Sequence, residues 1–77
     1  MIKLAAIDIG SNAVRLMLAR VLEDRTEVTF VKDSLIRFPL RLGEDVFSTQ
    51  RISKEKAAKL ETVIRAFKDL INASDAV

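Results

Sequence analysis

The lengths of the connections between three strand-like segments restrict the fold of this chain more than any other feature of its sequence. Apolar and β-branched residues run from Met1 to Ile9, alternate with polar ones over 13–22, and return over 26–38. Only three residues separate each segment from the next. A connection this short suits an antiparallel hairpin, whereas a parallel crossover needs about a dozen residues or more. The sequence therefore predicts three consecutive antiparallel strands.

After the third strand, the sequence predicts a loop and then one helix. Pro39 removes a backbone donor and Gly43 permits a turn, so residues 38–51 are expected to form a long loop. Ser53 is a good N-cap residue for a helix near 53–72. The apolar positions of that helix recur on one face, at Ala57, Leu60, Val63, Ile64, Phe67, Leu70 and Ile71.

Both faces of the first strand carry apolar side chains, and one helix can cover only one of them. Ile2 and Leu4 alternate with Ala5 and Ile7, so both faces are expected to be buried. We therefore expect residues 1–77 to be the N-terminal fragment of a larger, incomplete α/β domain. The remainder of the polypeptide would cover the second face, or a partner would, a second copy of the chain included.

The composition excludes several kinds of chemistry. The sequence has no cysteine and no histidine, which removes disulfides, the usual zinc sites, thiol nucleophiles and Ser-His catalysis within this chain. Its 13 basic and 11 acidic residues leave a net charge of +2, too small to indicate specific nucleic-acid binding. There is no signal-peptide pattern and no apolar stretch near the roughly 18 to 20 residues that span a bilayer, so we expect a cytoplasmic protein without a membrane partner.

One acidic residue stands where a buried strand meets three small residues. In the stretch AAIDIGSNAVRLML, Asp8 is followed closely by Gly10, Ser11 and Asn12, and a second apolar run begins at once. A glycine lets backbone N–H groups approach an anion, a hydroxyl or amide adds donors, and a carboxylate can hold Mg²⁺ beside a phosphate. The same residue types are also common in plain turns, where Asp8 would only stabilise the backbone. The residues by themselves leave both interpretations open.

Two further segments give this stretch a resemblance to a known family. AAIDIGSNAVRLML is followed by RLGEDVF, residues 41–47, and then by the amphipathic RISKEKAAKLETVIRAF. This order resembles the N-terminal end of the exopolyphosphatase and guanosine pentaphosphate phosphatase family, within the actin, sugar kinase and Hsp70 superfamily. The similarity extends over essentially the whole chain. Asp-Ile-Gly-Ser-Asn with a downstream Arg-Leu-Gly is its most specific part.

The resemblance implies a partial ribonuclease-H-like (actin-like ATPase) domain whose first two strands and their turn form a phosphate-binding loop. Asp8 would hold Mg²⁺ directly or through water, and Gly10, Ser11 and Asn12 would contact phosphate oxygens. Arg41 matches the arginine of Arg-Leu-Gly, where it could face phosphate or remain a solvated charge. No catalytic residue is expected in this chain. The second phosphate loop and the glutamate that activates water would both lie beyond residue 77.

The activity that the resemblance implies is release of terminal phosphate from inorganic polyphosphate or guanosine pentaphosphate. Two positions depart from the family pattern, because Ala13 replaces a small hydroxyl residue and Asp45 replaces a glycine. Arg15 on the second strand could reach the loop or be an ordinary exposed arginine. Two other functions remain open: a nucleotide-binding or assembly module of the same superfamily that performs no hydrolysis, and a small stand-alone interaction domain.

Overall fold

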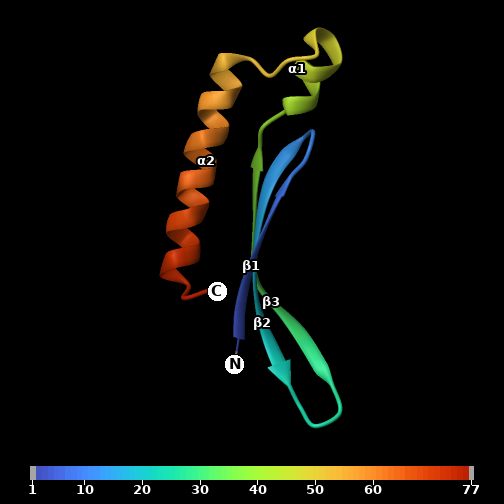
Figure 1. The fold of residues 1–77 in the computed structure, drawn as a ribbon, viewed down its shortest axis with the longest axis vertical. Coiled ribbons are helices and arrows are strands. Elements are labelled where there is room, and N and C mark those ends of the chain that lie inside the picture. The colour runs from blue at the N-terminus through green and yellow to red at the C-terminus, as the bar shows by residue number, and fades with distance from the viewer. Residues whose placement is uncertain (1, 77) are drawn as a thin grey trace.

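The computed structural model describes residues 2–76, and its three strands precede its two helices (Figure 1). The strands are β1 (Ile2–Ile9), β2 (Ala13–Glu23) and β3 (Val28–Pro39). The helices are α1 (Leu42–Thr49) and α2 (Lys54–Ala73). β1 pairs with β2 and β2 with β3, both antiparallel, in one sheet of order β1-β2-β3. The predicted α/β class and its antiparallel meander are therefore confirmed.

The predicted loop over residues 38–51 is wrong, because α1 lies within it and the described residues hold two helices rather than one. Glu44 and Asp45 lie in the first turn of α1, where acidic side chains interact favourably with the helix dipole. Gln50 ends the helix in the left-handed conformation, with φ of 59°, and donates its N–H to the carbonyl of Val46 at 2.9 Å. Gly43, expected to make a turn, instead lies inside the helix.

The strand register divides the sheet into two faces. Ile7, Leu16 and Ile36 form one row across the three strands on one face, and Asp8, Arg15 and Arg37 form a row on the other. The pairing of β2 with β3 shifts between Leu18 and Ala19, whose partners are Ser34 and Lys32. Asp33 is therefore an extra residue in β3, and its carboxylate accepts a hydrogen bond from Arg20 Nε at 2.8 Å.

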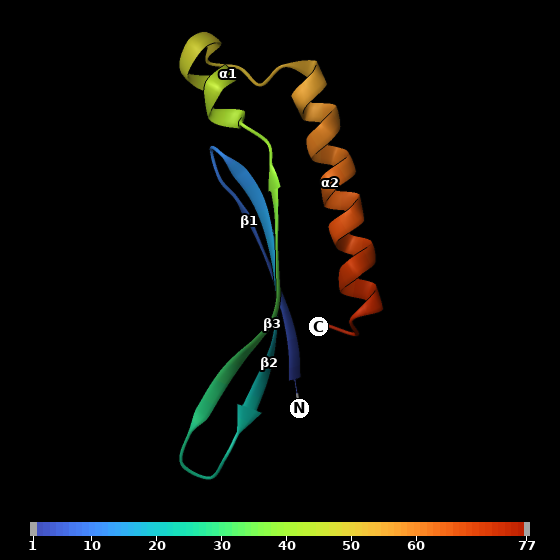
Figure 2. The same cartoon turned by 180° about the vertical axis from the view of Figure 1, so that it is seen from behind.

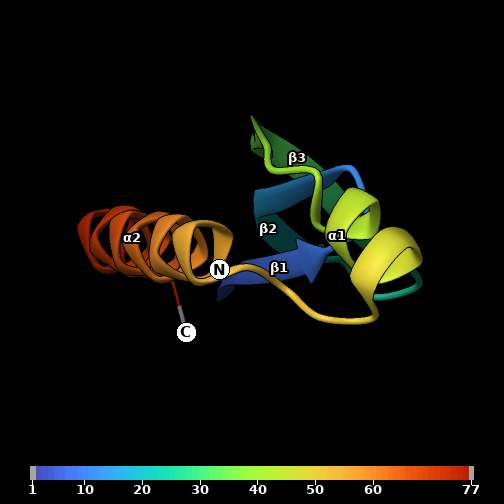
Figure 3. The ribbon, with the colours of Figure 1, turned by 90° about the horizontal axis from the view of Figure 1, so that it is seen from above.

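Helix α2 covers one face of the sheet. Figure 3, which looks down on the fold, shows α2 to one side of the three strands. Val63 and Phe67 of α2 are buried, Leu60, Ile64 and Ile71 are partly buried, and Leu70 stays 41% exposed despite its predicted place on the apolar face. The hydrophobic core is the cluster of Val14, Leu16, Leu40, Leu42, Val63 and Phe67. Residues from the sheet, the segment after β3 and α2 thus share one core.

The described residues do not bury β1, whose apolar faces are expected from the sequence to be covered in part by further sequence or a partner. Every described residue of β1 is exposed or only partly buried, and Ile2 and Ile9 are about half exposed. The physical reason is that β1 is an edge strand while α2 packs on one face of the sheet only. Figures 1 and 2 show the β2–β3 hairpin extending past the C-terminal end of α2. No helix within residues 2–76 is long and apolar enough to cross a membrane.

Candidate phosphate-binding turn

The β1–β2 turn is held from one side by the segment that follows β3. The carbonyl of Asn12 accepts a hydrogen bond from the N–H of Leu40 at 3.2 Å, and the carbonyl of Ser11 accepts one from the N–H of Gly43 at 2.8 Å. Gly43 belongs to the first turn of α1, whose N–H groups have no partner within the helix. The segment of residues 40–43, which contains Arg-Leu-Gly, therefore docks directly on the β1–β2 turn, the predicted phosphate-binding loop.

This docking requires a glycine at position 43. A Cβ atom placed there would lie 2.9 Å from the Cβ of Ser11 and 3.3 Å from the Ser11 carbonyl oxygen. Real Cβ atoms essentially never approach a neighbour as closely as the first of these distances. The glycine of Arg-Leu-Gly thus serves a close approach of two backbones rather than a turn.

The anchoring of the Ser11 carbonyl directs one donor of the turn, the N–H of Asn12, away from α1. In a trans peptide unit the N–H points opposite to the C=O, so the N–H of Asn12 points away from Gly43. Within residues 2–76, neither the N–H groups nor the side chains of Ser11 and Asn12 donate a hydrogen bond to protein, and both residues are exposed. These donors are free to bind an anion.

Gly10 contributes space rather than a donor. Its N–H already donates to the carbonyl of Ala13 at 2.9 Å, which closes the hairpin. Its φ is not in the left-handed region, so the backbone angles alone do not require glycine. A Cβ there would lie 3.3 Å from the Ala13 oxygen, a tight contact. Of the three predicted phosphate-contacting residues, Ser11 and Asn12 offer free donors and Gly10 does not.

Asp8 is the only acidic side chain predicted to hold metal, and it lies at the end of β1 opposite Arg15. Its carboxylate is 67% exposed and lies 3.5 Å from Arg15 Nε. Residues 2–76 hold no group of three acidic side chains that could bind a metal ion by themselves. Mg²⁺ commonly keeps several waters and uses one or two carboxylates together with substrate phosphates. An exposed Asp8 beside free phosphate donors fits that pattern as one protein ligand of such a site.

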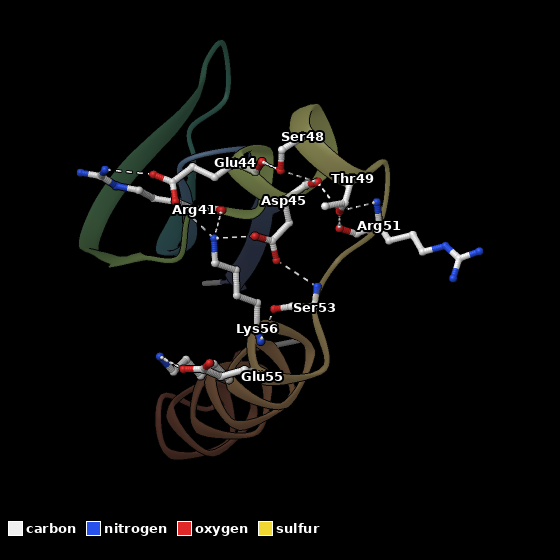
Figure 4. A network of polar contacts seen from close by, with 10 residues as sticks. Arg41, Glu44, Asp45, Ser48, Thr49, Arg51, Ser53, Glu55 and Lys56 are labelled. Carbon is white, nitrogen blue, oxygen red and sulfur yellow. Dashed lines mark hydrogen bonds and ion pairs between the residues drawn. The ribbon is translucent and has the colours of Figure 1, made fainter.

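Arg41 lies beside the turn in sequence, but its guanidinium is directed elsewhere. Nη1 of Arg41 contacts Glu44 Oε1 at 3.2 Å, and its side chain is 70% exposed (Figure 4). No contact joins it to the turn in the part of the chain that the structure describes. Water screens an exposed ion pair of this kind, so the pair with Glu44 could open for a phosphate at little cost.

A polar cluster that the sequence did not reveal joins α1 to the start of α2 (Figure 4). Asp45 Oδ2 accepts the N–H of Ser53 at 2.9 Å, while Lys56 Nζ lies 3.3 Å from Asp45 Oδ1 and donates to the Arg41 carbonyl at 2.6 Å. The hydrogen bond from the Ser53 backbone lowers the pKa of the Asp45 carboxyl, and Lys56 lowers it further. Asp45 therefore fixes the position of the segment that leads into α2.

The sequence also did not single out Arg37, which the register places beside Arg15 on the face away from α2. Like charges on directly opposite residues repel each other. Asp8, Arg15 and Arg37 lie in one row across the three strands close to the turn, and Arg15 pairs with Asp8. The alternation of side chains along β3 could have identified Arg37, but only once the pairing of β3 with β2 was known.

This chain is similar in sequence to a segment of a longer curated protein. No protein family model matches it. A bifunctional 3-dehydroquinate synthase/phosphatase from Fusobacterium nucleatum subsp. nucleatum is 30% identical over 69 residues, which are 88% of this chain and 10% of that protein. The chain thus spans about a tenth of the length of this curated relative.

Proposed function

We propose that the β1–β2 turn binds phosphate and that the chain supplies the first half of the phosphate site of a ribonuclease-H-like phosphohydrolase. The observation that carries the proposal is the anchoring of the Ser11 carbonyl by Gly43, which turns the N–H of Asn12 outward, beside donors of Ser11 and Asn12 that bond to no described residue. Donors held in place before the ligand arrives stabilise charge that develops during reaction. The motif resemblance adds the substrates, inorganic polyphosphate or guanosine pentaphosphate. The printed name of the relative includes a phosphatase activity.

Each residue of the turn has a separate role in the proposed site. Ser11 and Asn12 bind phosphate oxygens through their N–H groups and side chains. Asp8 holds Mg²⁺, which when bound offsets phosphate charge and polarises the phosphoryl oxygen. Arg15 orients the Asp8 carboxylate through their contact at 3.5 Å. The carboxylate that activates the attacking water and a second phosphate loop come from sequence beyond these 77 residues. The rest of that polypeptide is therefore the first expected partner of this chain.

Substitution of Asp8 in the longest natural polypeptide tests this proposal. Asp8→Asn keeps the size of the side chain and removes the charge that Mg²⁺ requires, so Mg²⁺-dependent phosphate release from polyphosphate and guanosine pentaphosphate should fall by about a hundredfold or more. Asp69→Asn is the matched control, because Asp69 is exposed on α2 far along the chain from the turn, and it should change the rate little.

The outcome for Asp8→Asn separates the alternatives. Near-normal Mg²⁺-dependent release by this variant would show that Asp8 only stabilises the turn. Binding of a magnesium nucleotide by the unmodified protein without any phosphate release would instead favour a nucleotide-binding or assembly module that performs no hydrolysis.

A further inference from the structure

Phe47, on α1, is an exposed aromatic side chain close to the β1–β2 turn. It is 85% exposed, the most of any large apolar side chain within residues 2–76. A single exposed apolar side chain is ordinary on a protein surface, so its exposure alone carries no conclusion. The position of the ring is more informative, because α1 lies at the end of the sheet that holds the β1–β2 turn (Figures 1 and 2).

The ring of Phe47 lies beside Ser11. Its Cε2 atom is 3.3 Å from the point where a Cβ of residue 43 would lie, and the Cβ of Ser11 is 2.9 Å from the same point. Phe47 follows Gly43 by one helical turn, and side chains in a helix lean towards its N-terminus, which brings the ring over the glycine. A larger residue at position 43 would stand between the ring and the turn. The glycine therefore lets an aromatic ring lie next to the free donors of Ser11.

We propose that Phe47 stacks on the base of a nucleotide whose phosphates bind at the β1–β2 turn, so that the site prefers a nucleoside polyphosphate to inorganic polyphosphate. This inference rests on the phosphate-binding turn proposed above. In a nucleotide one sugar joins the base to the phosphates, which keeps the two groups close together, as the ring and Ser11 are here. Every base presents an aromatic face, so a phenylalanine ring binds bases with little preference for one over another.

The rest of the polypeptide is the other group that could cover the ring, and the two occupants make opposite demands on residue 47. A protein core selects for volume, so it tolerates leucine in place of phenylalanine better than the larger tryptophan. Stacking selects for an aromatic face, which leucine lacks and tryptophan enlarges. A nucleotide and a protein core therefore predict opposite rankings of Phe47→Leu and Phe47→Trp.

Calorimetric titration of the longest natural polypeptide with two ligands that resist hydrolysis, in the presence of Mg²⁺, tests this inference. One ligand is guanosine triphosphate with an imido bridge between its β- and γ-phosphates, and the other is imidodiphosphate, which has no base. Phe47→Leu should weaken binding of the nucleotide by about tenfold, because the stacked ring is lost, and leave binding of imidodiphosphate unchanged. Phe47→Trp should bind the nucleotide at least as tightly as the unchanged protein.

Phe30→Leu is the matched control. Phe30 is 67% exposed and lies on β3 opposite Val21, towards the tip of the β2–β3 hairpin and away from the turn, so this variant should change neither affinity. The corresponding adenosine triphosphate analogue should lose affinity in Phe47→Leu by a similar factor, because stacking does not distinguish the bases. Circular dichroism checks that each variant is folded.

Several results would overturn the inference. Equal loss of both ligands in Phe47→Leu would show that the ring only supports the turn, and full nucleotide affinity in this variant would show that no base rests on it. Weak nucleotide binding by Phe47→Trp would indicate that protein covers the ring, and absence of nucleotide binding by the unchanged polypeptide overturns the inference as well. Failure of the phosphate-binding turn looks different, because Asp8→Asn would then leave the affinity for imidodiphosphate unchanged.

Discussion

At the scale of single residues, the candidate site depends on how closely two backbones approach each other. Gly43 donates to the Ser11 carbonyl at 2.8 Å, and only a residue without a side chain allows that distance. The glycine is therefore part of the site although it would not touch phosphate. Its role is to hold the Ser11 carbonyl in place so that the free N–H of Asn12 keeps one orientation.

Gly43→Ala should consequently destabilise the chain and loosen the turn. The new Cβ would lie 2.9 Å from Ser11 Cβ, and overpacking of this kind costs about 1 to 3 kcal/mol in the free energy of unfolding. Urea unfolding followed by circular dichroism measures the change. Gly10→Ala, whose closest contact would be 3.3 Å, should cost less, and Ser11→Gly should restore part of the loss in Gly43→Ala. Unchanged stability in Gly43→Ala would show that α1 does not dock on the turn in solution.

At the scale of helices and strands, the sequence predicted the elements that depend on the local pattern of apolar and polar residues. Period-two alternation and two short connections predicted three strands within a few residues of their bounds, and Ser53 was correctly expected to cap the long helix, where its Oγ accepts the N–H of Lys56. The eight residues of α1 were missed, because Pro39 and Gly43 indicated a loop and the helix depends on contacts distant in sequence. The same limit applies to the site. The placement of Asp8 near the end of β1 and of a turn at residues 10–12 could be predicted, but the anchoring by Leu40 and Gly43 could not.

The stability that the contact between α1 and the start of α2 contributes should depend on pH, because Asp45 makes that contact through its carboxylate. Its pKa is lower in the folded chain than the ordinary aspartate value of 3.8, first because it accepts the Ser53 N–H. A lowered pKa means that the charged carboxylate stabilises the fold above that ordinary value, and that this contribution disappears as the pH falls through the lower, folded pKa. The stability difference between the unchanged chain and Asp45→Ala should therefore be largest near pH 7 and shrink below about pH 4.

Urea unfolding of the unchanged chain and of Asp45→Ala, at several pH values from neutral to below about pH 4, measures this difference in stability. Asp69→Ala is a control, because this exposed residue belongs to no ion pair in the described part of the chain. A difference for Asp45→Ala that stays constant from neutral to acid pH would contradict the role assigned to its charge.

At the scale of the whole molecule, the chain combines one covered and one uncovered sheet face. The core lies between the sheet and α2, while the sheet face turned away from α2 keeps apolar residues in water. The candidate site lies at the end of the sheet where α1 docks, and Asp8 at its edge lies on the same face as Arg15 and Arg37. The 77-residue chain is expected to bind phosphate without hydrolysing it.

The most direct test of the phosphate-binding turn is a titration of the ¹⁵N-labelled chain with tripolyphosphate, followed through backbone amide chemical shifts. With Mg²⁺ present, the amides of Ser11 and Asn12 should shift most and that of Gly10 less, because its N–H is already bound to Ala13. Removal of Mg²⁺, or Asp8→Asn, should reduce these shifts strongly, whereas Asp69→Asn should leave them unchanged. Shifts spread over the basic residues of α2, or equal shifts at the turn in Asp8→Asn, would contradict the assignment of this turn as a phosphate-binding loop.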